Sequence, residues 1–71
     1  MTSHPVTPHT LTAEMVDALR NDASIAGDAE TVRICDEYAF AVDERDPAYA
    51  DDIAEHAISI CRILNAARAQ T

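Results

Sequence analysis

The sequence predicts an all-α fold, a small three-helix bundle built on an antiparallel helical hairpin with a flexible N-terminal arm. Apolar residues recur every three or four positions in three segments, and no segment shows the alternation typical of strands. Each segment also begins with a residue that can cap a helix. The chain has 71 residues, of which 48% are hydrophobic, so we expect one domain with a thin core.

The expected arm covers residues 1–10, and the single helical domain covers residues 11–71. The arm contains Pro5 and Pro8 and has no arginine, no lysine and no apolar stretch, so it does not resemble a signal peptide. Its two histidines, His4 and His9, are interpreted as solvated side chains rather than metal ligands. Since no apolar run in the sequence could span a membrane, we expect a cytoplasmic protein with no membrane partner.

The first helix is expected at about 13–26. Thr12 can cap its N-terminus, and Leu11 and Val16 are spaced to form a hydrophobic staple across that cap. Gly27 is the only glycine of the chain, and its place after the last apolar position predicts a left-handed C-terminal cap. The inward stripe of this helix is expected to contain Met15, Leu19, Ala23 and Ala26.

The second helix is expected at about 29–43, with Asp28 as its N-cap. Two apolar stripes run along it, and the stronger stripe is expected to face the core. The stronger stripe contains Val32, Cys35, Tyr38, Ala39 and Val42, and the weaker one contains Ile34 and Ala41.

The third helix is expected at about 47–69. Asp46 can cap it, and Pro47 would occupy the first helical position, where a missing N–H has no cost. Acidic residues lie early and arginines lie late, as the helix dipole favours. Its apolar stripe contains Tyr49, Ile53, Ala57, Ile60, Leu64 and Ala67.

The stripes of the second and third helices match each other in an antiparallel hairpin. If the chain turns near Arg45, facing residues have numbers that sum to about 91, and apolar residues then face each other throughout. The facing pairs are Val42–Tyr49, Tyr38–Ile53, Cys35–Ala57 and Val32–Ile60.

The same register predicts that the two cysteines are free thiols. It separates Cys35 from Cys61 by about 9 Å along the hairpin, whereas a disulfide needs Cα atoms within about 7 Å. We expect both side chains to be small buried hydrophobes.

No pattern in the chain is typical of a catalytic or metal site. A single glycine excludes a phosphate-binding loop, and there is no Cys-x-x-Cys pair. Asp52 and His56 have metal-ligand spacing without an evident third ligand, so an ion pair along the helix is the simpler interpretation. A nucleophilic pair of Cys35 and His56 would lack an orienting group and an oxyanion hole. We therefore expect no enzyme activity, metal or cofactor.

The formal net charge is −8, from 13 acids and 5 arginines. This charge disfavours direct binding of nucleic acid and favours a protein partner with a basic surface. The acids cluster around the turn between the second and third helices, where they form either a solvated surface or a docking face. The candidate partner-binding residues are Asp36, Glu37, Asp43, Glu44, Asp46, Asp51, Asp52 and Glu55.

The stretch Ala26-Gly27-Asp28, followed by Val32 and Cys35-Asp36, resembles a helical hairpin of small uncharacterised bacterial and phage proteins. In size, charge and helical content the chain is also similar to anti-CRISPR proteins and DNA mimics, which inhibit nucleic-acid machinery. The first resemblance implies a helix-turn-helix-shaped hairpin and no activity, whereas the second implies an inhibitor; neither assigns functional residues.

Two hypotheses of function follow from these observations. The first is an inhibitor or adaptor that docks its acidic turn on a basic, nucleic-acid-binding surface of another protein. The alternative is a structural or self-assembling helical module that forms a homodimer, in which the acids only keep the protein soluble. In that case the dimer surface would be the secondary apolar stripe of Ile34, Ala41 and Ile58.

Overall fold

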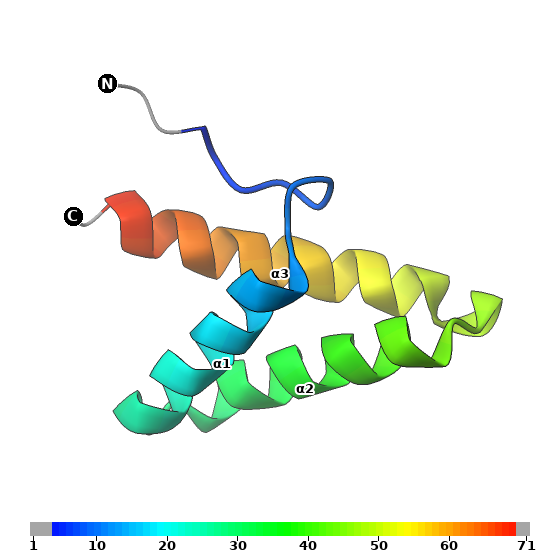
Figure 1. Ribbon diagram of the computed structural model, residues 1–71, viewed down its shortest axis with the longest axis horizontal. Coiled ribbons are helices and arrows are strands. Elements are labelled where there is room, and N and C mark those ends of the chain that lie inside the picture. The colour runs from blue at the N-terminus through cyan, green and yellow to red at the C-terminus, as the bar shows by residue number, and fades with distance from the viewer. Residues whose placement is uncertain (1–3, 70–71) are drawn as a thin grey trace.

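The computed structural model describes residues 4–69 and consists of helices joined by short turns. The elements are α1 (Ala13–Ala26), α2 (Ala29–Glu44), the short 3-10 helix η1 (Pro47–Tyr49) and α3 (Ala50–Ala69). No strand occurs within the described residues. Helices α2 and α3 form an antiparallel hairpin, and α1 crosses α2 at its open end (Figure 1). The predicted fold class, an all-α bundle of three helices, is confirmed.

A single turn ends α1 and starts α2. Gly27 adopts φ 78°, and its N–H and that of Asp28 donate to the carbonyls of Ser24 and Ala23 at 3.2 and 2.8 Å. This arrangement is a Schellman cap, in which two otherwise unpaired carbonyls at the helix end are satisfied. Asp28 then caps α2, because its carboxylate accepts from the backbone N–H and the hydroxyl of Thr31 at 3.2 and 2.6 Å. The chain therefore reverses within two residues.

The turn between α2 and α3 differs in detail from the expected one. Helix α2 extends to Glu44, and Arg45 closes it in the left-handed region with φ 56°. The Asp46 carboxylate accepts from the Ala48 N–H at 2.9 Å, as expected of a cap. Pro47, however, opens the tighter η1 rather than α3, so the α-helix begins only at Ala50.

The core joins all three helices through one buried residue from each. Val16 of α1, Cys35 of α2 and Ile60 of α3 form a single cluster, and Ile60 has no exposed surface. Partly buried side chains surround this cluster; they are Leu11, Leu19, Ile34, Tyr38 and Leu64. The buried face of α1 is therefore rotated slightly from the expected one, since Val16 is buried while Ala26 is exposed.

The inward face of α2 follows the favoured stripe only in part: Cys35 is in the core and Tyr38 packs against it, but the stripe fails toward the C-terminus of the helix. Ala39 and Val42 are exposed, with 43% of Val42 open to solvent, whereas Thr31 and Ala41 are buried. The reason is that α2 contacts α1 on one side and α3 on the other, so its buried face points between them. Thr31 tolerates burial because its hydroxyl donates to Asp28.

Because of the same rotation, the residues expected to form a dimer surface lie in different environments. Ala41 is buried and Ile34 packs against the core cluster, while Ile58 is 45% exposed. These three residues therefore do not share a surface.

The predicted hairpin register is nevertheless close to the observed one. The rings of Phe40 and Tyr49 meet edge to face at 6.0 Å, and the His56 imidazole lies 3.3 Å from the Glu37 carboxylate. Both pairs fall within about two residues of the expected alignment of antiparallel helices. The individual partners differ because of the rotation of α2: Tyr49 meets Phe40 rather than Val42.

The segment expected as a flexible arm lies along α3 from His4 onward (Figure 1), and residues 1–3 fall outside the described part. Val6 is 5% exposed, its N–H donates to the Asn65 side chain at 2.8 Å, and the Asn65 amide donates back to its carbonyl at 3.0 Å. Arg68 donates to the His4 carbonyl at 3.2 Å. The expectation of a free arm missed these contacts, because none of them is encoded by local sequence pattern.

Both cysteines are free and buried, as the register predicts. Within residues 4–69 no helix combines the length and the apolar character needed to cross a membrane.

Candidate functional site

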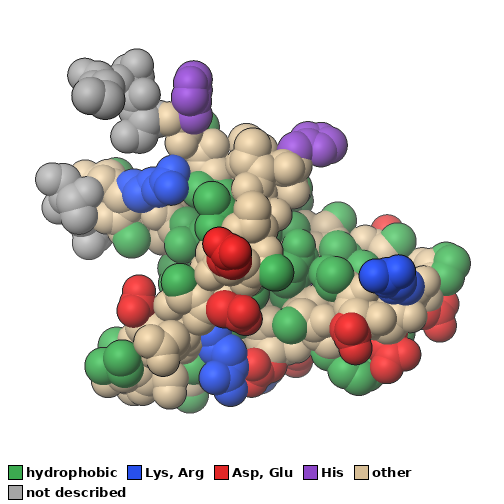
Figure 2. All heavy atoms as spheres, viewed as in Figure 1, with side chains coloured by type: hydrophobic (Ala, Val, Ile, Leu, Met, Phe, Trp, Pro, Cys, Tyr) green, Lys and Arg blue, Asp and Glu red, His purple; other side chains and the backbone are tan. Residues whose placement is uncertain are grey.

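The strongest candidate site is a groove between α2 and α3, with a volume of about 570 Å³. It lies beside the α2–α3 turn. Figure 2 shows acidic side chains at this end of the molecule and others over α1. Its lining combines three carboxylates, a histidine and an apolar floor. The lining residues are Asp36, Glu37, Phe40, Ala41, Tyr49, Asp52 and His56.

Asp36, at one edge of the groove, is held by an arginine of α1. The Nε atom of Arg20 donates to one carboxylate oxygen of Asp36, and Nη2 donates to the other at 3.3 Å. The hydrogen bond and the negative charge of Asp36 raise the pKa of Arg20 above its usual range. Since both side chains are about half exposed, the pair orients α1 against α2 more than it stabilises the fold.

Glu37 is paired across the groove with His56 at 3.3 Å. The sequence suggested instead that His56 would pair with Asp52 on its own helix. The structure shows the interhelical pair because α2 presents Glu37 toward α3, and 24% of the His56 side chain remains exposed. This leaves Asp52 in the groove wall without a hydrogen bond or an ion pair among the described residues.

Two aromatic rings form the apolar end of the groove. Phe40 is 57% exposed, although it is one of the largest apolar side chains of the protein. It packs edge to face on the half-buried Tyr49, with 75° between the ring planes. Buried Ala41 lies between α2 and α3 and leaves the space open, because its side chain is small. An exposed aromatic ring beside carboxylates can bind a cation through an ion pair and through a cation–π interaction.

The remaining acids of the predicted cluster are exposed but do not line this groove. Asp46 caps the turn through Ala48, and Asp43 lies with Arg45 at a separate hollow of about 220 Å³ between α1 and α2. Glu44 is exposed at the last position of α2.

Asp51 and Glu55 are exposed on α3 and lie one turn apart on the same face as Ile58. The structure therefore brings Asp36, Glu37 and Asp52 together and places these two elsewhere. All eight predicted residues are exposed, and three of them share one groove.

Comparison of the chain with protein-family models, curated proteins and solved structures finds no match.

Residues 4–69 contain no group of three or more histidine, cysteine or acidic side chains arranged to hold a metal ion. Cys35 packs in the core with Val16 and Ile60, while His56 lies in the groove with Glu37. Burial raises the pKa of both thiols, which opposes the thiolate that a nucleophile needs.

Sequence reasoning missed Phe40, Tyr49 and His56 as parts of the site. Phe40 belongs to neither apolar stripe of α2, and this was the available signal: a large aromatic residue off the core face. Arg20 carried no comparable signal, because its partner Asp36 lies on another helix.

Proposed function

We propose that this protein is an acidic protein-binding module, an inhibitor or adaptor that docks on a basic, nucleic-acid-binding surface of another protein. The observation that carries the proposal is the distribution of charge at the α2–α3 turn. From Asp43 to Glu55 six exposed carboxylates accompany one base, Arg45. Such a surface attracts a basic partner over a distance and steers its approach.

The shape of the molecule supports an inhibitory role. It measures 38 × 28 × 17 Å, and its acids extend from α1 to the first turns of α3. Carboxylates spread over an elongated surface can occupy positions that nucleic acid phosphates would take on a basic protein. We therefore propose a cytoplasmic inhibitor without enzyme activity, similar in kind to DNA mimics and anti-CRISPR proteins.

Binding kinetics test the proposal with a nucleic-acid-binding protein isolated by its affinity for this chain. Reversal of Asp51, Asp52 and Glu55 to lysine is expected to lower the association rate about tenfold or more. Raising the salt concentration should also lower the association rate, because surface charges are screened over about 8 Å at physiological ionic strength. Nucleic acid should compete with this protein for the partner.

The matched control reverses three exposed acids of α1, Glu14, Asp17 and Asp22. If the α2–α3 turn is the docking face, this second set has a clearly smaller effect on the association rate. Equal effects of the two sets would indicate general charge attraction without a docking face. Binding that resists both sets and salt would contradict the proposal.

The alternative, a homodimer, is not favoured by the stripe proposed for it, because Ala41 is buried and Ile34 packs against the core.

A further inference from the structure

The groove between α2 and α3 contains one carboxylate that the fold does not use. Asp36 is engaged by Arg20 and Glu37 by His56, whereas no hydrogen bond or ion pair within residues 4–69 engages Asp52. Asp52 lies on the first turn of α3, where its charge is favourable for the helix and needs no partner to be stable. A cation that enters the groove therefore finds an unpaired carboxylate without having to break an existing pair.

The apolar end of the groove adds a second requirement on the occupant. Phe40 is 57% exposed and its ring is fixed edge to face against Tyr49, so an aromatic surface stays open to solvent beside Asp52. A partner that covers the ring removes its apolar surface from water, which favours binding. The volume of about 570 Å³ lies within the range of pockets that hold small molecules, and it is ample for a guanidinium group.

We propose that this groove binds an arginine side chain of the partner protein, with its guanidinium on the Asp52 carboxylate and its plane against the exposed ring of Phe40. The inference rests on the proposed function and specifies where the basic partner is anchored. Arginine fits both requirements, since its planar guanidinium pairs with a carboxylate through two parallel hydrogen bonds and stacks on aromatic rings. Lysine offers a compact charge that is more strongly hydrated and stacks less well.

The partner's basic residues outside the groove would meet the exposed acids nearby. Asp51 and Glu55, on the outer face of α3, then contribute to steering rather than to anchoring. This division gives the two neighbouring aspartates different roles, although Asp51 and Asp52 carry the same charge on the same turn of one helix.

The experiment titrates the isotopically labelled protein with an alanine-rich helical peptide that carries four arginines, and with its four-lysine counterpart, observed by NMR. The expected shifts centre on the groove, and the arginine peptide binds about threefold or more tightly than the lysine peptide. Asp52→Asn is expected to weaken arginine binding about five- to tenfold, and Phe40→Ala about threefold or more. Asp51→Asn, the matched control, is expected to change it less than twofold.

The outcomes separate this inference from the proposed function. Salt-sensitive binding of both peptides that Asp51→Asn and Asp52→Asn weaken equally would overturn the groove as the anchor and leave the acidic docking face standing. Shifts centred away from Phe40 and Asp52 would also overturn it. Absence of binding to either peptide at low salt would contradict both proposals. Circular dichroism of each variant confirms that the helices are intact.

Discussion

At the scale of single residues, two left-handed positions mark the ends of helices. Gly27 adopts φ 78° at the end of α1, and Arg45 adopts φ 56° at the end of α2. Glycine visits this region freely, whereas a side chain with a Cβ is strained there by about 1–2 kcal/mol. The first position thus has the residue that its geometry favours, and the second does not.

Substitution at these two positions should therefore have opposite effects. Gly27→Ala is expected to lower the free energy of unfolding by about 1 kcal/mol through the backbone alone, because a Cβ there meets no atom within 4 Å. Arg45→Gly should be more stable than Arg45→Ala by a similar amount, since both remove the charge and only alanine keeps the strain. Urea unfolding followed by circular dichroism measures both differences. A Gly27→Ala variant as stable as the parent would contradict the Schellman cap.

Asp28 makes the start of α2 sensitive to acid. The hydrogen bonds from the hydroxyl and the N–H of Thr31 lower the pKa of Asp28 below its ordinary value of 3.8. Because the folded state holds the charged form, this contribution to stability is present above pH 3.8 and is lost as the pH falls through the lowered pKa.

Asp28→Asn isolates this effect, since asparagine also caps a helix but does not titrate. The stability difference between the parent and Asp28→Asn is expected to be constant at neutral pH and to shrink below about pH 4. Urea unfolding at a series of pH values measures it. A difference that stays unchanged down to pH 2 would contradict the role of the charged cap.

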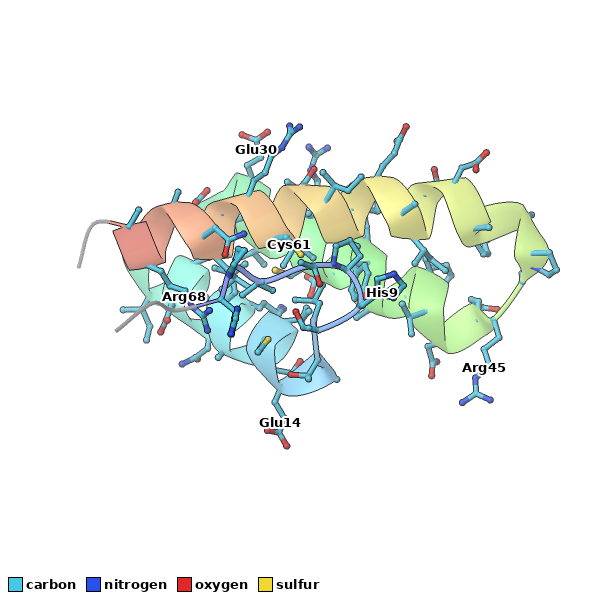
Figure 3. The ribbon with its side chains drawn as sticks, turned by 90° about the horizontal axis from the view of Figure 1, so that it is seen from above. His9, Glu14, Glu30, Arg45, Cys61 and Arg68 are labelled. Atoms are coloured by element: carbon cyan, nitrogen blue, oxygen red, sulfur yellow. The ribbon has the colours of Figure 1, made fainter. Side chains whose placement is uncertain are left out.

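At the scale of elements, the least regular segment is attached to α3 by the side chains of Asn65 and Arg68. Asn65 of α3 binds both the N–H and the carbonyl of Val6, as a neighbouring strand would. Cys61, labelled in Figure 3, lies one turn earlier on α3 and therefore on the same face of the helix as Asn65. We therefore expect the segment from His4 to Thr10 to help bury this thiol, which is 5% exposed.

Loss of the Asn65 hydrogen bonds should expose Cys61 without unfolding the helices. Asn65→Ala is expected to speed the reaction of native Cys61 with a thiol reagent about tenfold, because two hydrogen bonds of about 1 kcal/mol each no longer hold the segment. Cys35, which is 1% exposed in the core cluster, is the internal control and should stay slow. Mass spectrometry assigns the labelled cysteine. Equal acceleration at both cysteines would indicate global unfolding instead.

At the scale of the whole molecule, the core is small and one residue joins its parts. Ile60 has no exposed surface and meets Val16 of α1 and Cys35 of α2. A domain of this length buries only about 60% of the surface of its unfolded chain, so no second core can compensate for damage to the first.

Two substitutions of the same kind on α3 test this dependence. Ile60→Ala is expected to lower the free energy of unfolding by about 2–5 kcal/mol, a large part of the total for a domain of this size. Ile58→Ala removes the same atoms from a side chain that is 45% exposed and should cost less than about 1 kcal/mol. Thermal unfolding of both variants checks the difference. Similar melting temperatures would place the core elsewhere.

The helices and their ends could be read from the sequence because their causes are local. Thr12, Asp28 and Asp46 each accept a backbone N–H two or three residues ahead, and Gly27 supplies the left-handed cap. The register of the hairpin was also accessible, since two periodic apolar stripes match in few ways. The acidic character of the α2–α3 turn is likewise a property of the sequence itself.

The rotation of α2, and with it the groove, was decided only by tertiary structure. Apolar residues surround most of this helix, so hydrophobicity alone does not specify which of them faces inward; the positions of α1 and α3 do. That rotation buries Ala41, exposes Phe40 and brings Glu37 to His56. The contact of Val6 with Asn65 joins residues 59 positions apart. Local hydrogen bonds and periodicity act within about one helical turn, whereas these contacts depend on how whole helices pack.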